Sequence, residues 1–297
     1  MHRLPAISGA VAEWSKALAW KVSIRQNRIE GSNPSRSAIS SATDPSMKLT
    51  PRLIEKPWGR TDIPAMFGDT RGRRIGEIWF EGEGRLPLLA KYLFTSERLS
   101  VQNHPSAKHE CWLILDAEPG ATLGLGLKRE VGRDELRAAA LDGSIVELMD
   151  WEPVRAGDFY YVPPGTIHAI GAGISLLEFQ QNSEITYRLY DYRRPRELHL
   201  EEALSVAVPG PYASQLIHVD PAQPAVLAGG PPFALVHAVD GASALPDRRR
   251  WVLPLEGRVR VGNEAAGPGE CLLVKAGIAL AMEGRALIGA EGSITAA

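Results

Sequence analysis

Residues 101–112, VQNHPSAKHECW, hold several side chains that bind metals or transfer protons. The segment reads as two short extended runs, and side chains at positions i and i+2 of a strand share one face. Gln102 and His104 therefore point the same way, and Lys108 and Glu110 share a face on the next run. Imidazole, carboxylate and amide oxygen are metal ligands, although a lone histidine in a strand is more often structural. The alternation alone identifies candidate residues rather than a site.

A second segment, GDFYYVPPGTIHAIG, has turn residues at fixed spacing before a histidine. Gly157 is followed by Pro163, Gly165 and His168, with five, one and two residues between them. This spacing resembles the second sequence motif of the cupins, in which a strand, a tight Pro/Gly turn and a returning strand place the histidine inside a β-barrel. The resemblance implies an upstream partner motif that supplies two ligands two residues apart and then a glutamate.

The upstream pattern is present in QNHPSAKHE. The cupin resemblance therefore implies Gln102, His104, Glu110 and His168 as metal ligands. Two imidazoles, a carboxylate and an amide oxygen suit Zn²⁺ first, then Mn²⁺, Fe²⁺, Co²⁺ or Ni²⁺. An iron centre would fit an oxygenase, but glutamine at the first ligand position argues against that class. We expect one Zn²⁺ per chain.

The elements that must position these side chains are short strands. From Ile75 onward, short runs rich in apolar or aromatic types are bounded by Gly, Pro, Ser or Asp: IGEIWF, LLAKYLF, LSVQNH, ECWLIL, ATLGLGL, DFYYVP and SLLEFQQ. Such close spacing predicts an antiparallel barrel or sandwich. We also expect a helical insertion at about 133–151, split at Gly143, and a short helix over 200–206.

The last third of the chain repeats this texture after a stretch that contains VPGPYA and AGGPP. Within it, GPGECLLVKAGIAL has the rhythm of RAGDFYYVPPGTIHAI but lacks the histidine. We predict a mainly β protein in two domains. A jelly-roll-like cupin barrel with a small helical insertion spans 47–208, and a degenerate cupin-like β domain spans 209–297.

Residues 1–46 differ in composition from the rest of the chain. They carry six Lys or Arg against three acidic residues and end in SNPSRSAISSATDPS. A basic, Ser-rich and acid-poor segment fits a transit peptide, whereas charges interrupt the apolar run that a secretory signal needs. VAEWSKALAWKVSIRQNRIEGSNPSRS also resembles a mistranslated transfer-RNA gene, and MKLTPRLIEKPWGR offers a start at Met47. We favour the mis-assigned start and expect residues 1–46 to be disordered or spurious.

The overall composition excludes several classes of protein. The chain has 297 residues, 44% of them hydrophobic, and a formal net charge of −2. This charge gives no attraction to nucleic acid or to an anionic membrane, and no apolar run approaches the roughly 20 residues that cross a bilayer. The basic runs RGRR, RRPR and DRRR are interpreted as solvated surface. Cys111 and Cys271 are too few for a disulfide framework, so we expect a reducing, cytoplasmic location.

Six blocks over about residues 50–205 occur in the order found in type I mannose-6-phosphate isomerases: EKPWGR, IGEIW, LLAKYLFTSERLSVQNHP, KHECWLIL, YVPPGTIHAIGAG and EFQQNSEITYRLYDY. The chain is similar to the short bacterial members of that family. The resemblance implies a zinc-dependent interconversion of mannose 6-phosphate and fructose 6-phosphate by proton transfer through an enediolate. It also implies Glu178 as the acid/base residue, and Arg188 and Lys108 as positive charges for the phosphate or the enediolate.

Two places depart from the family pattern. Only Pro105, Ser106 and Ala107 separate His104 from Lys108, where the family has a longer loop with paired aspartates. Asn103 replaces an apolar residue, and a side chain that points away from the metal should affect packing more than chemistry. The shortened loop leaves an alternative function, a metal- and sugar-phosphate-binding cupin with weak or no turnover. Oligomeric state, the metal used in the cell and the choice among aldose phosphates stay open.

Overall fold

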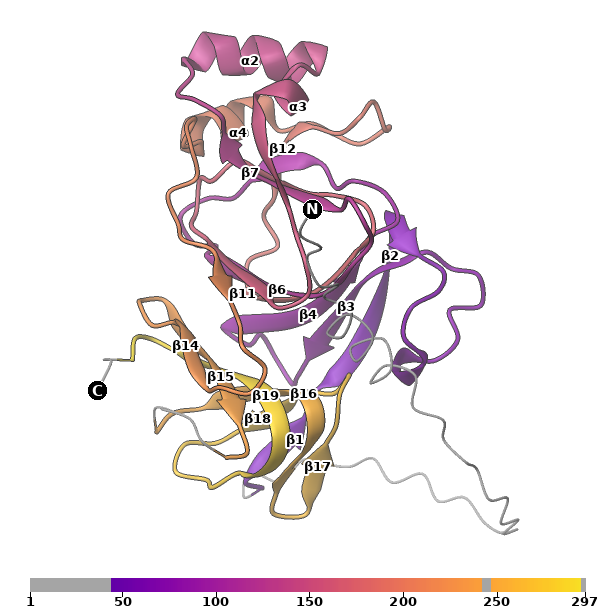
Figure 1. Cartoon of the computed structure of the whole chain (residues 1–297), viewed down its shortest axis with the longest axis vertical. Helices are drawn as coiled ribbons and strands as arrows, with labels where there is room; N and C mark the ends of the chain where they lie inside the picture. Colours follow the sequence, from indigo (N-terminus) through magenta and orange to yellow (C-terminus); the bar gives the residue numbers. More distant parts are fainter. Residues whose placement is uncertain (1–43, 242–246, 295–297) are drawn as a thin grey trace, which may run out of the picture. The chain divides into compact units, whose positions relative to one another are not determined.

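The computed structural model describes residues 44–241 and 247–294. The expectations for residues 1–43 therefore lie outside the described residues. From Pro45 onward the chain forms one compact unit. Within the described ranges its strands form three antiparallel sheets, called sheets I, II and III below (Figure 1). The predicted mainly β, cupin-like fold is confirmed.

Sheets I and II make up the barrel. Sheet I has the strand order β13 (Ile217–His218), β9 (Asp158–Val162), β6 (Glu110–Ala117), β11 (Ile174–Gln181), β4 (Leu88–Phe94), β3 (Ile75–Glu81) and β2 (Thr50–Arg60). Sheet II has the order β12 (Tyr187–Tyr190), β5 (Val101–Asn103), β10 (His168–Ile170), β7 (Thr122–Leu127) and β8 (Met149–Pro153). The predicted runs of apolar residues thus all contribute strands to these two sheets.

Sheet III lies in the C-terminal part of the chain, apart from its first strand. Its order is β1 (Ser46–Lys48), β18 (Leu272–Val274), β16 (Arg250–Val261), β19 (Ala281–Glu291), β15 (Phe233–Val239) and β14 (Ala225–Ala228), with β17 (Glu264–Ala266) paired to β16. Strand β1 belongs to this sheet, whereas β13 pairs with β9 of sheet I. Each side of the expected boundary at residue 209 therefore gives one strand to the other side, and the two-domain division stays a prediction.

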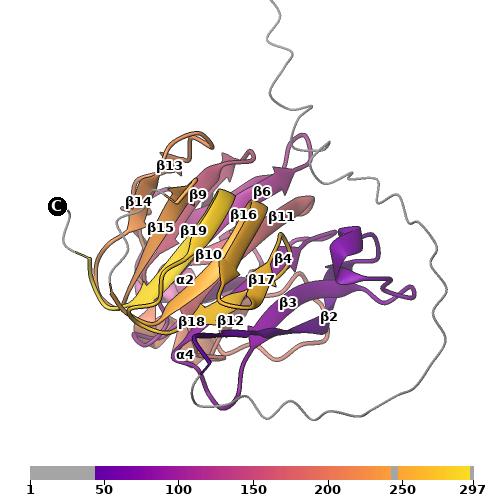
Figure 2. The ribbon, with the colours of Figure 1, turned by 90° about the horizontal axis from the view of Figure 1, so that it is seen from below.

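Sheet I is covered on both faces, as its continuous apolar runs require. Every residue of β4 is buried. Its even-numbered residues, from Leu88 to Phe94, join a core that includes Phe233 and Trp251 of sheet III. On the opposite face, Lys91 points into the space between sheets I and II. Figure 2 shows sheet III stacked over sheet I.

The helices are α2 (Arg133–Asp142), α3 (Ile145–Leu148) and α4 (Leu200–Val206), with a short 3₁₀ helix η1 at Ala65–Phe67. Gly143 ends α2 in a left-handed conformation, so the predicted split is confirmed. The predicted helix over 200–206 is confirmed as α4. The insertion ends earlier than expected, because Met149 begins strand β8. Helices α2, α3 and α4 lie over sheet II and share a hydrophobic core with it (Figure 1). In the described part of the chain, no helix is long and apolar enough to cross a membrane.

Candidate metal centre and active site

The two barrel sheets contribute different side chains to the space between them. Sheet II supplies Gln102 from β5 and His168 from β10, and these residues are direct cross-strand partners. His104 follows β5 by one residue. Sheet I supplies Glu110 at the start of β6 and Glu178 in β11. The site is therefore assembled between an imidazole-bearing wall and a carboxylate-bearing wall.

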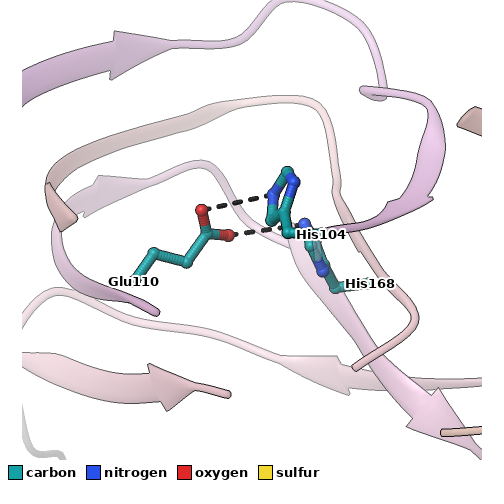
Figure 3. A group of neighbouring side chains, drawn as sticks. All are labelled: His104, Glu110 and His168. Atoms are coloured by element: carbon teal, nitrogen blue, oxygen red, sulfur yellow. Dashed lines mark ion pairs between the residues drawn. The ribbon is translucent and has the colours of Figure 1, made fainter. Parts of the chain in front are cut away.

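His104, Glu110 and His168 converge on one point, and all three are buried. The His104 Nε2 atom lies 3.3 Å from Glu110 Oε2, and the His168 Nε2 atom lies 3.4 Å from Glu110 Oε1 (Figure 3). The three ligand atoms all lie within 4.8 Å of one another. Both imidazoles thus face the two oxygens of a single carboxylate.

Backbone carbonyls set the orientation of both imidazoles. His104 Nδ1 lies 3.0 Å from the carbonyl oxygen of Ile185, and His168 Nδ1 lies 2.9 Å from that of Thr166. Each Nδ1–H therefore donates to a carbonyl, and each Nε2 presents a lone pair, as in metal sites with ordered outer partners. Two such lone pairs and two carboxylate oxygens repel one another unless a cation lies among them. The donor set fits a divalent metal.

Gln102 lies beside this group with its amide nitrogen 3.3 Å from His168 Nε2. Its amide oxygen accepts a hydrogen bond of 2.9 Å from the Ser100 hydroxyl. As a metal ligand Gln102 would present its oxygen, which requires a half-turn of the amide group. After that turn the amide nitrogen would donate to Ser100, so the serine can hold either orientation.

The Pro/Gly turn fixes the distance between the two histidine segments. Gly165 has φ of +80°, a conformation that favours glycine. Its N–H donates to the carbonyl oxygen of His104 at 2.9 Å. A Cβ at this position would lie 2.5 Å from the Val206 carbonyl oxygen. Gly165, the turn residue identified in the sequence, therefore joins the segment that precedes His168 to the backbone of His104.

Burial keeps both imidazoles neutral. It lowers the pKa of His104 to about 3 and also lowers the pKa of His168. For Glu110, burial acts to raise the pKa, but the positive charge of Lys108 holds it well below its usual value. Neutral imidazoles and an ionised carboxylate are the forms that ligate metals.

Lys108 is a buried residue at this centre and not a solvated loop lysine. It is 5% exposed, with its Nζ 3.3 Å from His104 Nε2 and 3.6 Å from Glu110 Oε2. Burial lowers its pKa. The shortened loop of residues 105–107 leads directly into it, and the Lys108 N–H donates to the Pro105 carbonyl oxygen at 3.0 Å.

Glu178 is paired with a lysine that the sequence did not single out. Its Oε1 lies 2.8 Å from Lys91 Nζ, and its Oε2 accepts a hydrogen bond of 3.2 Å from the Trp112 indole. Burial raises the pKa of Glu178 to about 7, against the opposing charge of Lys91. The carboxylate can therefore exchange a proton near neutral pH.

Lys91 belongs to a chain of alternating charges that runs along sheet I away from Glu178. Its positive charge favours the ionised form of Glu77, which is buried and accepts a hydrogen bond from the Trp79 indole. Lys56 lies 3.3 Å from Glu77. A lysine in the middle of LLAKYLF was a usable signal, because a charge inside a strand buried on both faces needs a partner.

Two adjoining cavities open onto these residues. The first, of about 70 Å³, is lined by Gln102, His104, Glu110, Glu178 and their neighbours. The second, of about 410 Å³, extends along the segment 183–187. The two cavities share the following lining residues: Lys56, Glu77, Lys91, Lys108, Thr186 and Arg188. The candidate metal centre thus opens onto a larger space whose charged lining residues include three lysines and an arginine.

Comparison with known proteins agrees with this arrangement. No protein-family model matches the chain. Mannose-6-phosphate isomerase ManA of Bacillus subtilis is 40% identical over 166 residues, which cover 47% of this chain and 52% of ManA. The YvyI protein of Bacillus subtilis, which carries the same family name, is 33% identical over 212 residues, covering 54% of this chain and 67% of YvyI. The chain belongs to the mannose-6-phosphate isomerase family.

Solved structures of the family agree with the fold. The mannose 6-phosphate isomerase from Bacillus subtilis has a TM-score of 0.70 at 26% identity, covering 83% of this chain and 99% of that one. A zinc-bound mannose 6-phosphate isomerase has a TM-score of 0.63 at 12% identity, covering 84% of this chain and 100% of that one. In sequence, the chain spans about half the length of ManA.

Arg188 is one of the residues expected from the family resemblance. It lines both cavities, and in the described part of the chain it forms no ion pair with Glu184 or Asp191. The side chain of Asn103 points toward α4 and donates to the Ala203 carbonyl oxygen at 2.9 Å. It joins β5 to α4, which is a packing role.

The interpretation of RRPR as solvated surface is wrong for Arg194 and Arg196, and that of DRRR is wrong for Arg250, which is buried. Arg194 and Arg196 bind Asp191, which is 2% exposed, and Arg196 lines the smaller cavity. The sequence pattern gave no indication of this, because a basic run looks the same whether or not a buried carboxylate lies beside it.

Proposed function

We propose that the protein is a zinc-dependent aldose–ketose isomerase that interconverts mannose 6-phosphate and fructose 6-phosphate. The proposal is supported above all by the convergence of two neutral imidazoles on the two oxygens of Glu110, beside a second carboxylate whose pKa lies near 7. Family membership supports the substrate class. Two buried, free cysteines suit the cytoplasm, where we propose that the protein works.

Gln102, His104, Glu110 and His168 would hold the metal. Zinc bound there would polarise the sugar oxygens and favour the negative charge that develops on them. A buried carboxylate, two imidazoles and one amide would provide four protein ligands, and a sugar oxygen would be a further ligand during the reaction. We propose one zinc ion per chain.

Glu178 would move the proton between C1 and C2 of the open-chain sugar. A general base must be ionised at working pH and close to the proton it removes. Burial raises the pKa of this carboxyl group, and the Lys91 ion pair and the Trp112 indole fix its position. Glu178 lines the smaller cavity together with the proposed metal ligands His104 and Glu110, which supports this role.

Lys108 and Arg188 would supply positive charge to the substrate. Lys108 lies against His104 and Glu110, so it suits the oxygens at the reacting end of the sugar. Arg188 lies where the two cavities meet. A planar guanidinium suits an anionic group with two or three oxygens.

The test is a coupled assay for fructose 6-phosphate formation from mannose 6-phosphate by the zinc-loaded protein, with and without a chelator. We expect turnover that the chelator abolishes and added zinc restores. Binding of mannose 6-phosphate by the zinc-loaded protein without any turnover would instead establish the alternative, a metal- and sugar-phosphate-binding cupin.

A further inference from the structure

The turn after β12 is built around one buried carboxylate that binds two arginines. Asp191 is 2% exposed. Arg194 donates from Nη2 to Asp191 Oδ1 at 2.7 Å, and Arg196 donates from Nη2 to the same oxygen at 2.6 Å and from Nε to Oδ2. Paired N–H donors on one carboxylate fix the plane of the Arg196 guanidinium.

Arg194 and Arg196 have different further contacts. Arg194 donates to the carbonyl oxygen of Arg98 at 2.8 Å and lies 3.8 Å from Glu97. Arg196 lines the smaller cavity together with Ser100, Gln102 and Arg188. Asp191 therefore holds the Arg196 guanidinium at the wall of the active-site cavity.

The backbone of this turn is strained where it positions Arg196. Tyr192 and Arg193 have φ of +52° and +61°, a left-handed conformation that is uncommon for residues other than glycine. Two such residues in succession reverse the chain directly after Asp191. Strain of this kind persists where the surrounding contacts hold it, here the hydrogen bonds to Asp191.

Arg188, on strand β12 before this turn, adds a second guanidinium to the lining of the smaller cavity. Its Nε is buried and has no hydrogen-bond partner among the described residues. Burial lowers its pKa first, and the positive charge of Arg196 lowers it further. Asp191 therefore binds Arg194 and Arg196, and the side chains of Arg188 and Arg196 line the cavity. An anion in the cavity would remove the repulsion between those two.

We propose that Arg188 and Arg196 form an anion subsite that holds the phosphoryl group of the sugar phosphate, with Asp191 as the residue that positions Arg196. This inference rests on the proposed function for the identity of its ligand. It assigns the two ends of the substrate to different groups: the phosphomonoester binds Arg188 of β12 and Arg196 of the following turn, whereas Lys108 and Lys91 serve the reacting carbons beside Glu178. Specificity for phosphorylated sugars then depends on Arg196, which lies outside the metal ligand set.

The first experiment measures the binding of inorganic phosphate by calorimetry to the zinc-loaded protein and to Arg196→Gln. Loss of a charge-assisted, two-donor contact should weaken phosphate binding by about 10- to 100-fold. Arg193→Gln is the matched control, because it removes an equal charge from an exposed side chain in the same turn. It should change the affinity by about twofold or less. Equal phosphate affinities for wild type and Arg196→Gln would overturn the subsite.

The second experiment separates the subsite from the isomerase reaction. In the coupled assay, Arg196→Gln should raise the KM for mannose 6-phosphate by about 10- to 100-fold and change kcat by about threefold or less. Turnover of unphosphorylated mannose, where measurable, should not change. If the wild-type protein shows no turnover, the proposed function fails, while the phosphate-binding comparison still decides the subsite.

The positioning role of Asp191 is tested by a double-mutant cycle. Asp191→Asn should weaken phosphate binding, and adding it to Arg196→Gln should have no further effect, because Asp191 acts through Arg196. Additive losses in the double variant would overturn the positioning role. Thermal unfolding of each variant identifies those that remain folded, and only these enter the cycle.

Discussion

Sheet I of the barrel and sheet III of the C-terminal region have a similar strand order, but only sheet I contributes to the candidate metal centre. The order β13-β9-β6-β11-β4-β3 in sheet I corresponds to β1-β18-β16-β19-β15-β14 in sheet III. Adjacent pairs correspond as well, since β6 pairs with β11 and β16 pairs with β19. The correspondence supports our interpretation of the C-terminal region as a degenerate second copy.

The turns that lead into β9 and β18 are also alike. Gly157 and Gly269 both have positive φ, +90° and +85°. In each turn the following acidic side chain accepts a hydrogen bond from the backbone N–H three residues before it, Asp158 from Arg155 and Glu270 from Gly267. Gly165 and Gly277 follow at the same spacing, again with positive φ.

The difference lies in what comes after the second glycine. Three residues after Gly165 is His168, and three residues after Gly277 is Leu280. In the barrel, the chain continues into β10 of sheet II, but no counterpart of sheet II exists among the described C-terminal residues. A turn ending in a left-handed glycine is therefore common to both sheets, and a metal site needs in addition a second sheet that carries imidazoles.

The largest expected effect comes from replacing His168 with leucine, the residue at the corresponding position 280 of the C-terminal region. His168→Leu removes one imidazole from a set of four ligands, so we expect loss of bound zinc and of at least about 10³-fold in turnover, since removal of a ligand disables the metal centre. Elemental analysis and the coupled assay measure the two effects. His109→Gln, a change at a partly buried histidine hydrogen-bonded to Tyr161, is the control and should retain zinc. Full zinc occupancy in His168→Leu would remove His168 from the ligand set.

Glu178→Gln separates the proposed role of Glu178 from that of Glu110. It removes the proposed base without removing a ligand, so kcat should fall by about 10²- to 10⁴-fold while zinc content stays at the wild-type level. The coupled assay and elemental analysis of the same sample give both quantities. Loss of zinc in this variant would show that Glu178 is a ligand and not the base.

The pH dependence of kcat/KM tests the environment of Glu178. A general base is active when deprotonated, and its pKa is raised to about 7, so kcat/KM should fall about tenfold per pH unit below that value. The charge of Lys91 lowers this pKa, so Lys91→Met should move the acid limb to higher pH. A pH–rate profile measures the shift. Lys128→Met, at a lysine bonded to the Glu147 carbonyl oxygen, should leave the limb in place. An unmoved limb in Lys91→Met would contradict the assignment.

The smallest effect concerns the contact between the two corresponding sheets. A Cβ at Gly289 of β19 would lie 2.2 Å from the ring of Phe179 in β11. Gly289→Ala should lower the free energy of unfolding by about 1–3 kcal/mol, because the ring must shift within a packed core. Denaturant unfolding measures this change. Gly267→Ala, whose Cβ would meet nothing closer than 3.8 Å, should change the stability by less than about 0.5 kcal/mol.

Local patterns were sufficient to predict the strands and the metal-binding candidates. Alternation over two residues placed Gln102 with His104, and turn chemistry placed His168, because both depend on short-range geometry. Lys91 was missed because its partner, Glu178, lies on a strand that is distant in sequence. Arg196 was misjudged for the same reason, since its environment depends on the burial of Asp191.

The register of the sheets was beyond sequence reasoning as well. The pairing of β1 with β18 joins residues more than 220 positions apart, and no local pattern specifies it. The shortened loop after His104 led us to consider a binding protein with weak or no turnover. The burial of Lys108 beside His104 was not predicted, because it depends on packing between segments and not on the loop length alone.

The double-sided burial of β4 limits how this protein could be shortened or recombined. A version that ends near residue 208 would retain every residue of the proposed active site, yet Leu88, Ala90, Tyr92 and Phe94 would lose the partners that cover them. An exposed apolar sheet face promotes association with other chains. The C-terminal region, which contributes no residue to the proposed chemistry, therefore keeps the catalytic barrel from aggregating, and a transplanted barrel would need polar residues on that face.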